Sequence, residues 1–207
     1  MSFQELIFTG ISRRQVNGIS ALPWRADRKC SLLRWVRCER CLIAMTGAVV
    51  VDSFAFLGMH SIDETVRSSC KAFFVQRVHN EIWMSLEHVG WCDDIIWHYS
   101  RAQQDAYYPF MDTLHSEMPI RRVGYEENDV ITALTDPALT DVPMRERLLL
   151  GMVLHRSAVL YTASPRLRNR RDLPVVAVPV IQEQQFPERL EQLYRVSLDL
   201  RLSTDTV

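Results

Sequence analysis

The sequence contains no run of apolar residues long enough to cross a membrane. Its longest apolar stretches, residues 44–59 and 148–161, are interrupted by Asp52 and by His155-Arg156, whereas a membrane-spanning helix needs roughly 18 or more consecutive apolar residues. Hydrophobic residues still make up 47% of the 207 residues, which is enough for a buried core. We therefore expect a folded, soluble protein without a membrane segment.

The sequence also lacks the evenly spaced cysteines of a disulfide-stapled secreted domain. Its five cysteines are an odd number and are irregularly spaced, so we expect a reducing compartment, the cytoplasm. Cys38 and Cys41 form one C-x-x-C pair with Cys30 upstream. A zinc site would need a fourth ligand, such as His60 or Cys70, and zinc is the weaker interpretation of this pair.

An overall excess of positive charge is missing as well. The net charge of −1 gives no global electrostatic reason to expect a nucleic-acid partner. Residues 1–44 differ from the rest, because they contain eight Arg and Lys against three Asp and Glu and show no sustained helical or strand period. Their composition resembles an organellar transit peptide. We predict that residues 1–44 are an extension, either disordered or upstream of a natural start, and that the fold begins at Met45.

After Met45 the pattern alternates between strands and helices. Short runs rich in apolar and β-branched residues predict strands at residues 48–51, 72–75, 120–123, 158–161 and 175–178. Helices are expected to begin near Ser61 and near Thr140, and to cover residues 78–87, 95–118 and 126–134. This alternation predicts an α/β fold with three α/β/α layers around a central parallel sheet. We assign residues 45–180 to this domain and residues 181–207 to a C-terminal helix and tail packed outside it.

Three short motifs carry acidic residues. Val49-Val50-Val51-Asp52-Ser53 is an apolar strand that ends in an acid and a small hydroxyl residue, and Val78-His79-Asn80-Glu81-Ile82 holds the second acid. Glu146 starts a predicted helix sixteen positions before Thr162, which ends a predicted strand. The order and spacing of these motifs resemble those of the PIN-like domain family, over about 130 residues of the chain.

The resemblance implies a nuclease-type site at the carboxyl end of the sheet. It implies that the catalytic residues and metal ligands are Asp52, Glu81 and Glu146. It implies that the substrate-binding residues are Ser53, Thr162, Ser164 and Arg166. The implied cofactor is Mg²⁺ or Mn²⁺, which would orient a phosphate and activate a water.

Two positions depart from the family pattern. Position 146 holds Glu where Asp is usual, and position 164 holds Ser where a fourth acid would stand. Because affinity for hard cations rises with the number of anionic ligands, we expect one ion, weakly held. Simpler interpretations stand beside these, since Glu81 and Glu146 could each serve a helix N-terminal dipole.

Three functions remain open at this point. The first is a metal-dependent ribonuclease, in the manner of a toxin with an antitoxin-like partner. The second is a degenerate PIN-like module that binds a protein partner or nucleic acid without cutting it, and the third is a small-molecule phosphohydrolase. RNA is the nucleic acid considered, a homodimer is one assembly that stays open because the sequence does not identify the oligomeric state, and an exposed subset of the aromatic residues could stack on bases.

Overall fold

A computed structural model describes residues 47–203 of the chain. The expectations for residues 1–44 and the cysteines Cys30, Cys38 and Cys41 lie outside the described residues. The two described cysteines, Cys70 and Cys92, are buried free thiols.

A five-stranded, fully parallel sheet forms the centre of the fold, with the strand order β3-β2-β1-β4-β5. The strands are β1 (Val49–Val51), β2 (Ile82–Ser85), β3 (Ile120–Val123), β4 (Val159–Thr162) and β5 (Val175–Ala177). The predicted α/β class with a central parallel sheet is therefore confirmed. Because the strand order changes direction between β1 and β4, their carboxyl ends form the crevice where such folds usually bind ligands.

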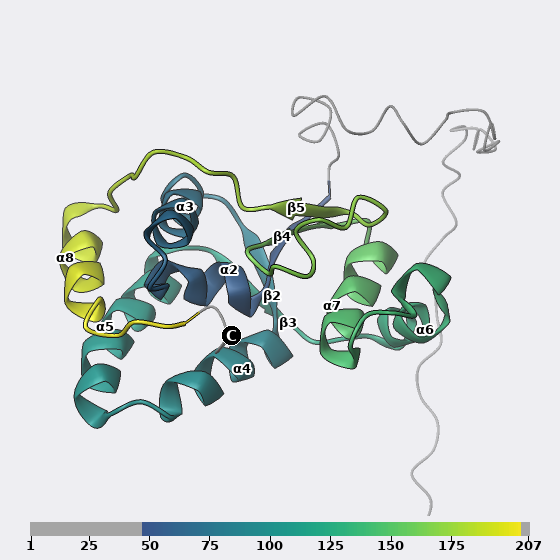
Figure 1. Cartoon of the computed structure of the whole chain (residues 1–207), viewed down its shortest axis with the longest axis horizontal. Coiled ribbons are helices and arrows are strands. Elements are labelled where there is room, and N and C mark those ends of the chain that lie inside the picture. The colour runs from purple at the N-terminus through teal and green to yellow at the C-terminus, as the bar shows by residue number, and fades with distance from the viewer. Residues whose placement is uncertain (1–46, 204–207) are drawn as a thin grey trace, which may run out of the picture. The chain divides into compact units, whose positions relative to one another are not determined.

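Helices cover both faces of the sheet (Figure 1). The helices of the described chain are α2 (Ser53–Leu57), α3 (Glu64–Val75), α4 (Leu86–Trp97), α5 (Arg101–Glu117), α6 (Glu127–Thr135), α7 (Met144–His155) and α8 (Glu188–Ser197), with short 3-10 turns η2 (Gly58–His60) and η3 (Pro137–Leu139). Successive side chains of β1 point to opposite faces of the sheet, so they pack into two different hydrophobic cores. Val51 packs with α2, α3, α4, α5 and α8, whereas Val50 packs with η3 and α7.

Two of the predicted elements are wrong. Residues 72–75 belong to helix α3 rather than to a strand, and residues 82–85 form strand β2 rather than part of a helix. Phe73 and Phe74 are fully buried, and a short buried apolar run does not distinguish a helix from a strand. Pairing with β1 and β3 selects the extended conformation for residues 82–85, so tertiary context decides this segment.

The C-terminal segment is part of the main core. Phe186, Leu190 and Tyr194 are buried among the residues of α3 and α5, so no packing boundary lies at residue 180. Beyond α8, Leu202 makes an isolated parallel bridge with Ser61. The Leu202 N–H donates to the His60 carbonyl at 2.9 Å, and the Ile62 N–H donates to the Leu202 carbonyl at 2.9 Å.

Candidate functional site

Asp52 lies at the switch point of the sheet, directly after β1, and is 1% exposed. One carboxylate oxygen accepts the Ala55 N–H at 2.8 Å, so Asp52 caps α2. The other oxygen accepts the hydroxyl of Thr162, the last residue of β4. Burial raises the pKa of Asp52 to about 7, and nearby Glu146 adds to this effect, although both hydrogen bonds oppose it.

Thr162 and Ser164 extend this arrangement along the end of β4. The Thr162 hydroxyl oxygen accepts the backbone N–H of Ser164 at 2.9 Å. Ser164 is 1% exposed, and its own hydroxyl is buried without a partner among the described residues. The structure therefore brings together Asp52, Thr162 and Ser164, as the sequence predicted.

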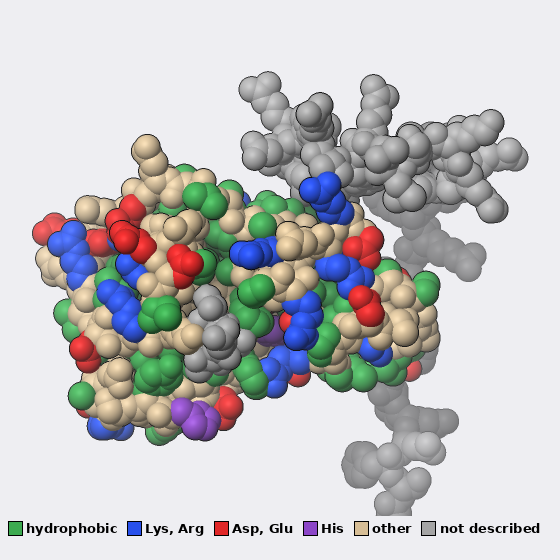
Figure 2. Space-filling model, in the orientation of Figure 1, with side chains coloured by type: hydrophobic (Ala, Val, Ile, Leu, Met, Phe, Trp, Pro, Cys, Tyr) green, Lys and Arg blue, Asp and Glu red, His purple; other side chains and the backbone are tan. Residues whose placement is uncertain are grey.

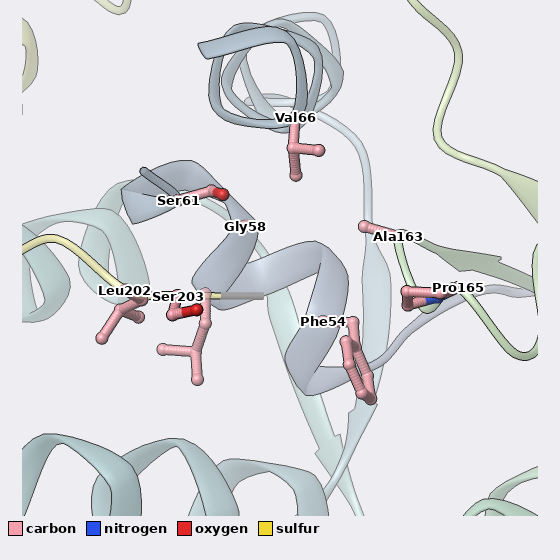
Figure 3. A pocket seen from close by; sticks show the side chains of 9 residues that line it. Phe54, Gly58, Ser61, Val66, Ala163, Pro165, Leu202 and Ser203 are labelled. Carbon is pink, nitrogen blue, oxygen red and sulfur yellow. The ribbon is translucent and has the colours of Figure 1, made fainter. Parts of the chain in front are cut away.

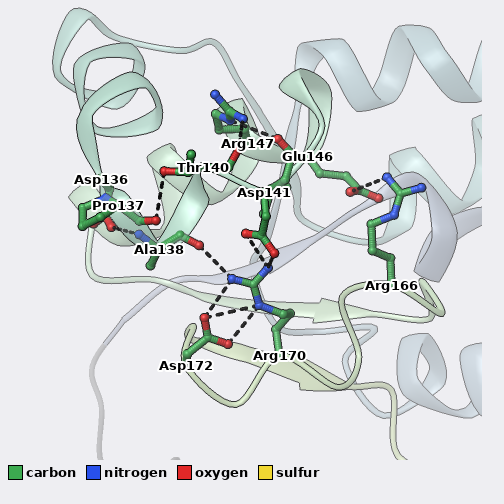
Figure 4. A network of polar contacts seen from close by, with 11 residues as sticks. Asp136, Pro137, Ala138, Thr140, Asp141, Glu146, Arg147, Arg166, Arg170 and Asp172 are labelled. Carbon is green, nitrogen blue, oxygen red and sulfur yellow. Dashed lines mark hydrogen bonds and ion pairs between the residues drawn. The ribbon is translucent and has the colours of Figure 1, made fainter.

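Glu146 reaches the same edge from the first turn of α7. Its carboxylate is 3.2 Å from the guanidinium of Arg166, which lies in the loop between β4 and β5 (Figure 4). Both residues line a cavity of about 330 Å³ together with Ser53, Phe54, His88, Trp91, Pro143 and Arg145. The predicted residues Ser53, Glu146 and Arg166 thus share one cavity.

Glu81 does not join the other acids, and the predicted convergence of three carboxylates is wrong. The register pairs Val51 with Met84, so Asp52 is level with Ser85 at the end of β2. Glu81 precedes β2 by one residue and lies about 13 Å farther back, at four residues and roughly 3.3 Å each. It is exposed, and its carboxylate accepts the Trp83 indole N–H at 2.8 Å.

His88 is a site residue that the sequence analysis missed. It lies in the first turn of α4, where the Ser85 side chain caps the helix by accepting the His88 N–H at 3.2 Å. The His88 Nδ1 atom accepts the Ser53 backbone N–H at 3.1 Å and is 3.2 Å from the Ser53 hydroxyl. Burial, followed by the charge of Arg145, lowers the pKa of His88 to about 4. The sequence signal that could have identified this position is the Ser85-x-x-His88 spacing, because a Ser that caps a helix accepts the N–H of the residue three positions later.

Arg145 supplies a second cation beside Arg166. Its guanidinium carbon lies 3.0 Å from the centroid of the Trp91 ring, and both side chains are half-buried in the cavity wall. Guanidinium groups over indole rings are stabilised by the ring quadrupole. Trp91 is one of the aromatic residues of which an exposed subset could stack on bases.

A separate polar network holds the loop that carries Arg166. Arg170 donates to Asp141, to Asp172 and to the Ala138 carbonyl, with distances from 2.7 to 3.3 Å (Figure 4). The neighbouring carboxylates hold the pKa of Arg170 above its ordinary value. These contacts tie the β4–β5 loop to η3 and to the turn before α7. They therefore hold in place the loop backbone from which the Arg166 side chain extends.

The side chains at this edge do not form a ready site for a divalent ion. Both oxygens of Asp52 already accept hydrogen bonds, and Glu146 pairs with Arg166. Within residues 47–203, no group of three or more His, Cys, Asp or Glu side chains is arranged to hold a metal. As these side chains lie, they do not provide the several oxygen ligands that Mg²⁺ and Mn²⁺ prefer.

Residues 44–207 match the family DUF6190, described as a family of unknown function. The chain belongs to the DUF6190 family. No curated protein and no solved structure matched the chain. The DUF6190 match covers every element of the described fold and all the residues that line the cavity, from Ser53 to Arg166.

A second, smaller depression was considered as a ligand site in this DUF6190 member. A small apolar groove lies between Phe54, Val66, Pro165 and Leu202 (Figure 3), and its volume of about 20 Å³ leaves room for little more than one water. The cavity that Arg145 and Arg166 line is the candidate ligand site because Ser53 and Arg166 in its wall follow β1 and β4, at the switch point of the sheet. Within the described chain, no helix combines the length and apolar character needed to cross a bilayer.

Proposed function

We propose that this chain is a PIN-like module that binds single-stranded RNA at the carboxyl edge of its sheet and needs no divalent metal to do so. One observation carries the proposal: Arg145 and Arg166, from two separate elements, line one cavity, and the carboxylates of Glu146 in its wall and of Asp52 nearby already have their own donors. Guanidinium groups match phosphate oxygens in geometry and charge.

The surface around the cavity supports a polyanionic partner. Arg168 and Arg171 are exposed in the same β4–β5 loop as Arg166, and within residues 47–203 neither forms an ion pair. Figure 2 shows basic side chains, coloured blue, near this loop and the adjacent α7, and they are arginines because the one described lysine, Lys71, is buried in α3. Such a local patch binds phosphates although the whole chain has a net charge of −1.

Single-stranded RNA fits better than a duplex because the cavity contains an aromatic face. The Trp91 ring lies half-buried in the wall, beside the Arg145 guanidinium. Unpaired bases stack on such rings, whereas bases inside a duplex do not reach them. The combination of a few cations with one indole is typical of single-strand binding surfaces.

Fluorescence polarisation with a short labelled RNA, in the presence of a chelator, tests the proposal. Binding should persist without metal. Arg166→Gln should weaken it and should reduce the slope of log affinity against log salt by about 0.7, the value for one lost phosphate contact on a single strand. Arg101→Gln, at an exposed arginine of α5 paired with Asp105, is the matched control. The proposal fails if the chain does not bind RNA at low salt, or if Arg166→Gln behaves like the control.

Metal-dependent ribonuclease activity is the second candidate. It is favoured by the closeness of Asp52 and Glu146, which is sufficient for Glu146 to raise the pKa of Asp52, and by the unpartnered Ser164 hydroxyl beside them. A toxin role with an antitoxin-like partner belongs to this candidate. It requires RNA cleavage that depends on Mn²⁺ or Mg²⁺, disappears in Asp52→Asn and increases in Ser164→Asp. An inert wild type and an equally inert Ser164→Asp would exclude it.

A further inference from the structure

His88, which lines the cavity, has a buried ring nitrogen that no described residue uses as a hydrogen-bond partner. His88 is 2% exposed, and its Nε2 atom has no hydrogen-bond partner among the described residues. An unpaired buried polar atom is destabilising, so this position favours a ligand that supplies the missing partner. His88 lines the same cavity as Arg145 and Arg166.

The protonation of His88 follows from its other nitrogen. The Ser53 backbone N–H can only donate, so the Nδ1 atom that receives it at 3.1 Å must be the unprotonated nitrogen. The low pKa of His88 keeps the ring neutral at pH 7. The single ring proton therefore sits on Nε2, and the unused group is an N–H donor.

Donors from three different elements meet at this cavity. His88 belongs to the first turn of α4, Arg145 to the first turn of α7, and Arg166 to the β4–β5 loop. Helices α4 and α7 both begin here, so the positive ends of their dipoles add to the attraction for an anion. The anion that such a set surrounds must offer several acceptor oxygens.

We propose that the cavity binds the phosphomonoester end of an RNA strand, with the His88 Nε2–H, Arg145 and Arg166 donating to its terminal oxygens. This inference rests on the proposed function and deepens it. A monoester has three terminal oxygens and carries close to two negative charges at pH 7, whereas an internal diester has two such oxygens and one charge. The cavity volume of about 330 Å³ leaves room for the nucleotide attached to that phosphate.

Among the residues that the structure describes, Glu146 is the one acidic residue that lines the cavity, and its charge opposes a phosphate. Its carboxylate keeps Arg166 in place at 3.2 Å but also repels a bound anion. Glu146→Gln removes the charge and keeps an oxygen to accept from Arg166. The variant should therefore bind the phosphorylated RNA more tightly, by about threefold, since a pair of charges in a partly exposed site contributes roughly 1 kcal/mol or less. A metal-dependent site would lose function with the same change.

The decisive measurement compares three RNAs of one sequence, carrying a 5′-phosphate, a 3′-phosphate or hydroxyls at both ends, in the presence of a chelator. At least one phosphorylated RNA should bind about tenfold more tightly than the hydroxyl form, the effect of one charge-assisted hydrogen bond. His88→Asn keeps an acceptor near Nδ1 but removes the Nε2 donor, and should lower this ratio towards one. His88→Gln, whose amide reaches towards the Nε2 position, should retain part of it.

Inorganic phosphate and a nucleoside monophosphate provide an arm that does not depend on RNA. Both should raise the melting temperature of the wild type and of Arg101→Gln, and should do so less in Arg145→Gln, a half-buried position that avoids the buried histidine. Equal binding of all three RNAs would overturn this inference and leave the RNA-binding proposal standing. Stabilisation by the monophosphates without RNA binding would overturn the RNA proposal and support the pocket for a small phosphomonoester. No effect of any phosphate would overturn the pocket assignment.

Discussion

The hydroxyl of Thr162 donates a hydrogen bond to the buried carboxylate of Asp52, and this contact joins the carboxyl ends of β4 and β1. The two residues are 110 positions apart in the sequence. The same hydroxyl oxygen receives the Ser164 N–H at 2.9 Å. One side chain therefore satisfies a buried acid and fixes the start of the β4–β5 loop.

Replacing Thr162 by Val should destabilise the protein by about 1–3 kcal/mol. Val has nearly the same shape, but it leaves an oxygen of Asp52 and the Ser164 N–H without partners, and each unpaired buried group is costly. Urea unfolding of the two proteins measures the difference. Thr162→Ser restores the hydroxyl and should recover most of the loss; if it is as unstable as Thr162→Val, the missing methyl group rather than the hydrogen bond explains the effect.

Stability should depend on pH through Asp52. The pKa of Asp52 is about 7 in the folded chain against an ordinary value of 3.8, so between these values the folded state binds more protons than the unfolded state. The contribution of Asp52 to the free energy of unfolding is then largest below about pH 4. It falls by about 4 kcal/mol in total as the pH rises to 7. Urea unfolding at a series of pH values from about 5 to 8 should show the decline.

Asp52→Asn should flatten that part of the pH profile, because the substituted side chain does not ionise. The exposed acid Asp105, which pairs with Arg101 on α5, supplies the control variant Asp105→Asn. The assignment to Asp52 would be refuted by an Asp52→Asn protein that keeps the wild-type decline between about pH 5 and 7.

Lys71 should be a large contributor to stability because it is a buried cation between α3 and α8. It is 1% exposed and lies 2.9 Å from Glu191, which is 6% exposed. Lys71→Met leaves the Glu191 charge in the core with Arg195 as its remaining ion-pair partner among the described residues, and breaking a buried pair costs about 3–5 kcal/mol. The double variant Lys71→Met/Glu191→Gln should recover part of this, since the new amide oxygen would still accept the Phe186 N–H. Denaturation midpoints of the wild type, Lys71→Met, Glu191→Gln and the double variant give the coupling energy between the two side chains. Additive losses in the double variant would argue against that coupling.

Two helical glycines should respond to alanine in opposite directions. A Cβ at Gly151 of α7 would lie 2.5 Å from the Asp129 carbonyl and 2.7 Å from Ala133, both on α6, whereas a Cβ at Gly90 of α4 meets nothing within 4 Å. Gly151→Ala should therefore force the two helices apart at a cost of about 1–3 kcal/mol. Gly90→Ala should gain up to about 1 kcal/mol from helix propensity. Thermal melts of both variants make the comparison, and a neutral Gly151→Ala would show that α6 yields easily.

Much of the fold and half of the site could be predicted from sequence because β1 and β4 are plain apolar runs. Each run ends in a polar residue, Asp52 or Thr162, and parallel strands bring such ends together. The sixteen-residue spacing from Glu146 to Thr162 placed α7 beside β4 correctly. Local chemistry and global fold agree in these segments.

The error at Glu81 arose from one misassigned segment. The run Ala72–Val75 has strand-like residues but is the end of α3, and the strand that follows begins at Ile82. The second strand was expected at residues 72–75 but begins ten residues later, at Ile82. Glu81 therefore precedes the strand and lies at the amino edge of the sheet, not at the expected carboxyl edge. The same error hid His88, since its helix starts only after β2. Residue types alone do not separate these alternatives, because pairing with strands β1 and β3 selects between them.

The bridge between Leu202 and Ser61 means that part of the fold can be completed only late in the synthesis of the protein. The His60 carbonyl and the Ile62 N–H obtain hydrogen bonds from Leu202, so these two bonds cannot form until the ribosome has translated the intervening residues. Phe186, Leu190 and Tyr194 likewise reach the core late. A nascent chain halted before α8 would expose the apolar surface of α3 and α5 that these residues cover, and such transiently exposed surface favours aggregation.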